Sequence, residues 1–212
     1  MTQHHPDSLK LMEYSAGNLS DPHALCIRLH LDQCSHCRSR VDMLDSLGAV
    51  MMEQQSQVSV SNSMFDSILA RIDESADEPF SPSVPNSASP LQKLLGEDLN
   101  KLPWKRQLGD ASVYDITDQF PGQNEQVVLQ KLTAGGKAPS HTHRGEETTI
   151  VLQGAFTDNK GVFNQWDFVT LDSQDNHKPV ALPGDDCITL SVLSAPVKLT
   201  GTFTRLLNPF IR

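Results

Sequence analysis

The sequence lacks both a long apolar run and an excess of basic residues. No stretch approaches the roughly 18 consecutive apolar residues that a membrane-spanning helix needs. The first residues also lack the charged and apolar segments of a secretory signal, so we expect a cytoplasmic protein without a membrane partner. The 212 residues include 17 basic and 26 acidic ones, giving a net charge of −9. This balance argues against direct nucleic-acid binding, which needs a basic surface.

The acidic charge is concentrated in the first third of the chain. Residues 1–79 contain 5 basic and 12 acidic residues, whereas residues 80–212 contain 12 basic and 14 acidic ones. An acidic module of this size tends to associate with a basic protein surface. The charge distribution therefore indicates a protein partner, such as a nucleic-acid-binding protein whose basic face it would cover.

Cysteine is scarce, and its spacing is informative. The chain has only four cysteines, Cys26, Cys34, Cys37 and Cys187. In a reducing cytoplasm these residues are better explained as metal ligands or buried thiols than as disulfides. We interpret Cys26 and Cys187 as core residues, which leaves the closely spaced pair Cys34 and Cys37 for chemistry.

The chain divides into two domains of different secondary structure. Helical patterns cover about 7–16, 20–30, 34–52 and 63–74. A segment with four prolines and five serines follows at 75–90, and its composition is typical of an extended linker. Strand-like segments then appear at 126–132, 147–153, 168–171, 187–193 and 199–206. The sequence predicts an all-α domain at 1–74, a linker at 75–90 and an all-β sandwich or barrel at 91–212.

The fourth predicted helix carries a narrow apolar stripe. Its apolar residues follow the i, i+3, i+4, i+7 pattern and are Phe65, Ile68, Leu69 and Ile72. The commoner explanation of such a stripe is that it completes a four-helix core. The alternative is that the helix lays this face on a partner protein.

A first group of potential metal ligands lies in the helical domain. His30, Cys34 and Cys37 form a His-x3-Cys-x2-Cys pattern, which places the three side chains on one side of a helix or around a helix turn. Thiolate and imidazole donors favour zinc, which requires a fourth ligand in a structural site. The fourth donor could be His5 or its neighbour His4. A redox function of the cysteine pair is the weaker alternative.

A second group lies in the β domain and matches a longer pattern. Gly135-x5-His141-x-His143-x3-Glu147-x6-Gly154 places two histidines on one face of a strand and a glutamate after the next turn. His177 could complete a set of three histidines and one carboxylate. The pattern resembles the first sequence motif of the cupin superfamily, which implies a site that can hold zinc, manganese, iron or nickel. In the second cupin motif, however, Gln165-Trp166-Asp167 stands where a glycine-containing turn is expected.

The order of these features resembles the ChrR family of zinc-binding anti-sigma factors. The resemblance rests on His4-His5, on His30, Cys34 and Cys37, and on the run from His141 into Val151-Leu152-Gln153-Gly154-Ala155-Phe156. It implies a small all-α zinc-binding bundle followed by an all-β cupin, or jelly-roll, barrel. It also implies that His5, rather than His4, completes the first zinc site.

By the same resemblance the protein is an anti-sigma factor and not an enzyme. The helical domain would bind an extracytoplasmic-function sigma factor, with the 63–74 stripe at the contact, and the cupin domain would be needed for release under singlet oxygen or related oxidants. Two release routes remain open, namely a change at the cupin metal and oxidation of Cys34 and Cys37. The alternative functions are a metal-dependent cupin dioxygenase or isomerase and a small-ligand sensor. The sequence leaves the oligomeric state open.

Overall fold

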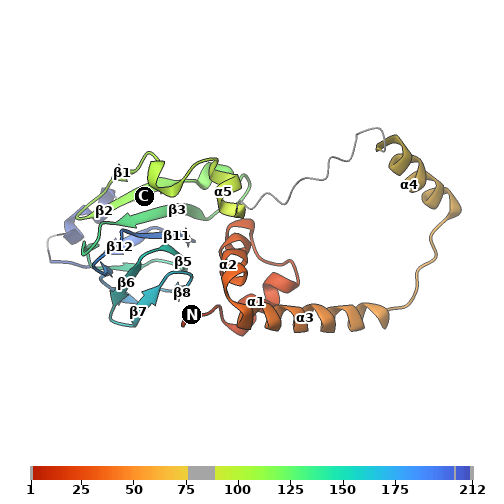
Figure 1. Cartoon of the computed structure of the whole chain (residues 1–212), viewed down its shortest axis with the longest axis horizontal. Helices are drawn as coiled ribbons and strands as arrows, with labels where there is room; N and C mark the ends of the chain where they lie inside the picture. Colours follow the sequence, from red (N-terminus) through yellow and green to blue (C-terminus); the bar gives the residue numbers. More distant parts are fainter. Residues whose placement is uncertain (1, 76–88, 203, 211–212) are drawn as a thin grey trace.

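A computed structural model describes residues 2–75, 89–202 and 204–210. The helices within residues 8–53 lie beside a β domain, and the helix Asn62–Ser75 lies apart from both (Figure 1). Most of the predicted linker, residues 76–88, lies outside the described residues. None of the helices in the described ranges combines the length and apolar character that crossing a membrane requires. The helices are α1 Ser8–Ser15, α2 Asp21–Gln33, α3 Ser35–Glu53, α4 Asn62–Ser75 and α5 Pro90–Leu95.

Capping residues explain where the first helices begin. The Asp7 carboxylate accepts a hydrogen bond from the Lys10 N–H at 2.8 Å and so caps α1. Ser20 precedes α2, whose first turn contains Pro22. Cys34 is the N-cap of α3, and its sulfur accepts from the Cys37 N–H. The α2–α3 junction therefore places Cys34 and Cys37 in one helical turn, directly after the end of α2.

Burial in the helical domain is restricted to α1, α2 and the start of α3. Leu11, Ile27 and Val41 are buried in the core. All side chains described in α4, from 63 to 72, are exposed, and the second half of α3 is exposed as well. Of the two explanations of the fourth helix, the one in which it completes a four-helix core does not hold in this structure. Its apolar stripe faces outward because the short α1 and α2 already cover the buried face of α3.

The β domain consists of antiparallel strands in one large sheet and two small ones. The large sheet has the order β1-β2-β3-β11-β5-β8, and the small sheets have the orders β10-β6-β7 and β12-β4-β9. The strands of the large sheet are β1 Lys105–Arg106, β2 Ala111–Asp115, β3 Gln126–Leu132, β11 Cys187–Leu193, β5 Glu147–Gln153 and β8 Phe168–Leu171. Those of the small sheets are β10 Val180–Ala181, β6 Ala155–Asp158, β7 Gly161–Asn164, β12 Val197–Leu199, β4 His141–His143 and β9 Asn176–His177. The all-α domain followed by a cupin-like barrel confirms the predicted fold class.

Four predicted strands coincide with β3, β5, β8 and β11, but the fifth prediction is wrong. A strand was expected at 199–206, whereas β12 ends at Leu199 and the 3-10 helix η3 covers Thr204–Phe210. The Asn208 side chain accepts from the Leu199 N–H at 2.8 Å and donates to the Leu199 carbonyl at 3.0 Å. These two bonds satisfy the outer edge of β12 at Leu199, and the Thr200 N–H still donates to the Ser140 carbonyl at 2.9 Å before the chain enters η3.

The large sheet is buried on both faces. One face packs against the helices and contributes residues such as Leu129, Ile150 and Leu190 to the same hydrophobic cluster as α1–α3. The opposite face lines the barrel interior with Val151, Leu171 and other apolar residues, which pack there against Phe156 of β6. Helix α2 contacts both β5 and β11. The helical domain and the barrel are consequently docked through a shared core.

Candidate metal centres

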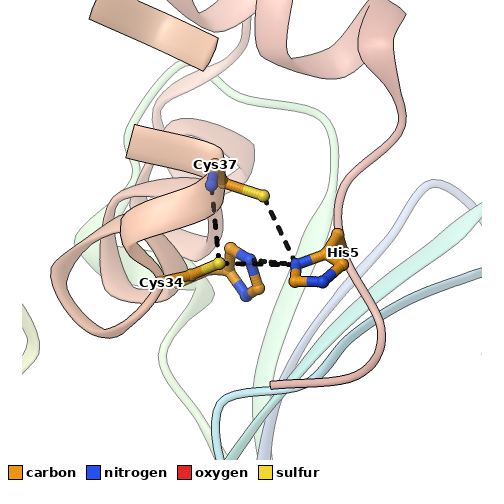
Figure 2. A group of neighbouring side chains, drawn as sticks. His5, Cys34 and Cys37 are labelled. Carbon is orange, nitrogen blue, oxygen red and sulfur yellow. Dashed lines mark hydrogen bonds between the residues drawn. The ribbon is translucent and has the colours of Figure 1, made fainter. Parts of the chain in front are cut away.

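The first ligand group comes from three separate segments of the helical domain. His5 precedes α1, His30 lies in the last turn of α2, and Cys34 and Cys37 begin α3. The ligand atoms of all four residues lie within 4.8 Å of one another. His5 Nδ1 is 3.4 Å from each cysteine sulfur and 3.3 Å from His30 Nε2. Figure 2 shows the two sulfur atoms pointing toward the His5 ring.

These separations fit a tetrahedral zinc ion. Bonds of about 2.0–2.3 Å from zinc to nitrogen and sulfur imply ligand-to-ligand distances of roughly 3.3–3.8 Å. His30 Nδ1 lies 2.8 Å from the Trp166 carbonyl, which can only accept a hydrogen bond. The proton of neutral His30 is therefore on Nδ1, and the Nε2 lone pair points toward His5. Two thiolates would neutralise the charge of the ion.

The two neighbouring histidines do not join this group. His4 Nε2 lies 3.1 Å from the Val162 carbonyl, and its ring packs against Phe163. The structure thus places His5, and not its rival His4, among the potential ligands. His36 is exposed, as expected for a residue outside the site. The His5 side chain is itself exposed, so solvent reaches the group from that side.

The pKa values of the two cysteines differ. Burial on its own would raise the pKa of Cys34, but hydrogen bonds from Thr2, Cys37 and His36 outweigh it and lower this pKa. Burial raises the pKa of Cys37 to about 12, and the neighbouring Cys34 adds to the effect. The thiolate form of Cys34 is thus favoured at the N-terminus of α3, whereas a bound cation would be needed to favour the thiolate form of Cys37.

The second ligand group lies in the barrel. His141 and His143 come from β4, and His141 is paired in register with His177 of β9. His177 Nε2 lies 3.0 Å from His141 Nε2 and 3.3 Å from His143 Nε2. The glycines of the motif, Gly135 and Gly154, have positive φ angles of 71° and 66°. A Cβ at Gly154 would lie 2.6 Å from the Asp186 carbonyl oxygen, so this turn requires glycine.

Outer hydrogen bonds fix the tautomers of two of these histidines. His141 Nδ1 donates to the Pro139 carbonyl and His177 Nδ1 to the Asp158 carboxylate, both at 2.8 Å. In the neutral form of both rings, the Nε2 lone pairs face each other across 3.0 Å. That arrangement is repulsive without a cation, and burial lowers the pKa of His141 to about 4. The donor set therefore fits a divalent metal ion.

Glu147 lies beside the three histidines but outside the group that they form. Its Oε2 is 3.0 Å from His143 Nδ1, yet neither of these buried atoms has a hydrogen bond within the part of the chain that the structure describes. Its Oε1 accepts from the Thr149 hydroxyl at 2.7 Å. Burial would raise the pKa of Glu147, but His143 and Thr149 outweigh it and lower this pKa to about 2. An ionised carboxylate with an unsatisfied buried oxygen is suited to metal binding, and its ligand function stays a prediction.

The outer partners of both groups were missed at the sequence level. Asp158 lies 19 residues before His177, and no spacing rule connects the two. The group that holds His30 is a backbone carbonyl 136 residues away, and a backbone carbonyl has no signature in the sequence. The degraded motif around Trp166 and Asp167 was the one available indication that this turn is unusual.

Comparison with known proteins decides the family. The chain is 34% identical over 213 residues to Anti-sigma-E factor ChrR of Cereibacter sphaeroides, an alignment that covers 99% of this chain and 98% of that protein. The chain belongs to the ChrR family of anti-sigma factors. The model of the ChrR cupin-like domain family matches residues 96–196, so the ChrR cupin-like domain includes the second ligand group.

A solved structure of a ChrR complex is similar to nearly the whole chain. It is the crystal structure of Rhodobacter sphaeroides SigE in complex with the anti-sigma factor ChrR, at 32% identity and a TM-score of 0.77. The match covers 91% of this chain and 100% of that chain. An RmlC-like cupin protein of Ralstonia eutropha matches at 23% identity and a TM-score of 0.41, covering 50% of this chain and 71% of that chain.

Proposed function

We propose that this ChrR-family protein sequesters an extracytoplasmic-function sigma factor in the cytoplasm and releases it under oxidative stress. The observation that supports this proposal best is the similarity, over 91% of the chain, to a structure titled as a complex of ChrR with SigE. The acidic first third of the chain also suits a sigma factor, whose nucleic-acid-binding surfaces are basic.

The contact surface of the proposed complex is the apolar face of α4. Phe65 is 59% exposed, Ile68 49% and Leu69 44%, and Ile72 is exposed on the same stripe. Such a row of exposed large apolar residues is costly in water unless a partner covers it. The second half of α3 presents a similar row at helical spacing, consisting of Met43, Leu47, Val50 and Met51. Both rows belong to the helical domain, so the partner would contact α3 and α4 together.

A pair of charge substitutions on α4 tests this contact. Leu69→Asp introduces a carboxylate into the stripe, whereas Ser67→Asp introduces the same charge on the opposite side of the helix. Losing one central anchor costs about 2 kcal/mol, or roughly a 30-fold loss of affinity for the sigma factor. The measurement is co-purification and titration with each extracytoplasmic-function sigma factor of the host. Equal binding by both variants would contradict the assignment of α4.

The two metal sites would have different functions in this proposal. The set His5, His30, Cys34 and Cys37 would hold a structural zinc ion that stabilises the sigma-binding domain. The barrel set of His141, His143, His177 and Glu147 would hold zinc, manganese, iron or nickel with an accessible coordination position. The barrel would then be required for the response to an oxidant.

The full chain with a changed barrel site tests the release step. His141→Ala removes one barrel donor and leaves the helical domain unaltered. We expect this variant to retain the sigma factor and to fail to release it after exposure to singlet oxygen. Release at the unaltered rate would instead favour oxidation of Cys34 and Cys37 as the trigger.

A cavity in the barrel favours small-ligand sensing as a second candidate function. A space of about 60 Å³ reaches His141, Glu147 and His177, and a wider space of about 540 Å³ adjoins it at His141 and Gln130. The wider space is lined by apolar and amide side chains without a charged group. Thermal unfolding of the metal-loaded protein with uncharged organic compounds tests it. A shift that His141→Ala abolishes would support a ligand at this site.

A further inference from the structure

The turn formed by residues 164–167, between β7 and β8, lies against the metal ligands of the helical domain. The Trp166 carbonyl accepts from His30 Nδ1 at 2.8 Å. The Asp167 carboxylate oxygen Oδ1 lies 2.6 Å from the Gln3 N–H nitrogen and 3.1 Å from that of His4. The Phe168 N–H then donates to the His4 carbonyl at 3.1 Å. The barrel thus bonds directly to the ring of His30. It also bonds to both backbone groups of His4, the residue before His5, because Asp167 accepts from the His4 N–H and Phe168 donates to the His4 carbonyl.

Trp166 adopts a backbone conformation that bulky residues avoid. Its φ is +72°, in the left-handed region where the cupin motif would place glycine. Its N–H donates to the Val151 carbonyl at 2.7 Å, which anchors the turn to β5. The indole packs against the hydrophobic core shared by the two domains. The residue with this unfavourable conformation is therefore the one whose carbonyl accepts a hydrogen bond from His30, the candidate ligand in α2.

Asp167 is fully buried, and its carboxylate is used almost entirely for backbone contacts. Besides Gln3 and His4, the Asn164 N–H donates to its Oδ2 at 2.8 Å. A buried carboxylate is tolerated only with such compensation. Two of its three partners belong to the extended segment before α1, on which His5 lies. This carboxylate therefore determines where the chain places His5.

We propose that the barrel provides the outer hydrogen-bonding shell of the His5, His30, Cys34 and Cys37 site. Asp167 positions His5 through the backbone at Gln3 and His4, and the Trp166 carbonyl positions His30. Metal retention in the helical domain then depends on docking of the barrel. This proposal concerns the retention of metal and stands independently of the identity of the protein partner.

Cobalt(II) is a suitable probe because it reports on this site alone. The full-length protein is loaded with Co²⁺, and the thiolate-to-cobalt absorption is followed after addition of a chelator. The barrel ligand set contains no thiol, so only the site of Cys34 and Cys37 gives this absorption. Gln3→Pro removes the Gln3 N–H, the nearer of the two N–H groups of this segment that donate to Asp167, and leaves the barrel sequence intact. Gln3→Ala retains that N–H and is its matched control.

A third variant separates positioning from docking in general. Lys10→Met breaks the 2.6 Å ion pair of Lys10 with Glu146, which joins the domains away from the ligands. Removing an outer-shell partner typically lowers metal affinity about 10- to 100-fold, so Gln3→Pro should lose Co²⁺ that much faster. Gln3→Ala and Lys10→Met should release Co²⁺ at the unaltered rate.

The opposite results would overturn the proposal. Equal release rates for Gln3→Pro and Gln3→Ala would show that the Asp167 contact does not position His5. Equally fast release from Lys10→Met and Gln3→Pro would show that docking alone matters. Asp167→Asn provides a second readout from the barrel side, because its amide keeps one acceptor oxygen and loses the charge. Its release rate should lie between those of the unaltered chain and Gln3→Pro, and an unaltered rate would again contradict the proposal.

Discussion

The two ligand groups differ in where their outer hydrogen bonds originate. In the barrel, the Pro139 carbonyl holds His141 and the Asp158 carboxylate holds His177, so the partners belong to the same domain. In the helical domain, the partner of His30 is the Trp166 carbonyl of the barrel. The outer hydrogen bonds of the barrel histidines thus come from the barrel itself, whereas the outer hydrogen bond of His30 exists only when the two domains are docked.

The groups also differ in how much core surrounds them. The barrel histidines lie in the small sheet of β4 and β9, in the same domain as the large sheet, whose strands β5 and β11 are buried. The helical domain has only a short list of buried apolar residues, mainly from α1, α2 and the start of α3. A small domain with so little core depends on a metal ion or a docked neighbour for its stability. We therefore expect the helical domain to be far more sensitive than the barrel to metal removal.

The largest expected effect is the loss of one thiol from the helical site. Structural zinc contributes about 10–16 kcal/mol of apparent binding free energy. Cys37→Ala should therefore unfold the helical domain while the barrel stays folded, as measured by hydrogen exchange of amides in α1–α3 and in β3, β5 and β11. Cys26→Ala removes another fully buried thiol that is not a ligand. As the matched control, it should cost only about 1–2 kcal/mol.

The Cys37→Ala prediction has a clear contrary outcome. Protection of the α1–α3 amides at the unaltered level would show that packing against the barrel stabilises this domain without metal. The stability of the helical domain would then depend on the core that it shares with the barrel and not on a metal ion.

A smaller effect is expected at the outer shell of the barrel site. Asp158 has a buried carboxylate that orients His177, so Asp158→Ala should lower the metal affinity of the barrel about 10- to 100-fold. Metal content per chain after dialysis against graded chelator measures this loss. The thiolate-to-cobalt absorption of the helical site should stay unchanged. Asp185→Ala, which removes an exposed carboxylate, is the matched control.

Loss of metal from both sites in Asp158→Ala would contradict this separation. It would mean that the barrel site also stabilises the turn at 164–167 that holds His30. A normal barrel affinity would show instead that the strand pairing of His141 with His177 is sufficient to orient the rings.

The sequence was most informative where side chains form a regular pattern. Short strand-like segments rich in apolar residues and bounded by turn residues predicted β3, β5, β8 and β11. The spacing of His30, Cys34 and Cys37, and that of His141 and His143, predicted groups that the structure brings together. In each case a local period determines on which face a side chain lies.

The parts that could not be predicted depend on contacts distant in sequence. Spacing alone left His4 and His5 open and the family resemblance favoured His5; the physical reason, the contacts of His4 with Val162 and Phe163 of the barrel, has no signature in the sequence. The strand expected at 199–206 ends at Leu199, whose backbone bonds to the side chain of Asn208 in the 3-10 helix that follows. The apolar stripe of α4 looks the same in sequence whether a core or a partner covers it. Periodicity therefore predicts a face, and only the fold shows what lies against it.

The smallest expected effect is at the ion pair that joins α1 to the barrel. Lys10 and Glu146 are 2.6 Å apart, but the Glu146 side chain is 44% exposed. The Lys10 side chain is only 12% exposed, but a pair with one solvent-exposed partner still contributes about 1 kcal/mol or less and is screened by salt. Lys10→Met should therefore lower the stability of the helical domain slightly in denaturant titrations at low salt and not at high salt. A large, salt-independent loss would mean that the ion pair, rather than the contacts of Trp166 and Asp167, determines the docking of the two domains.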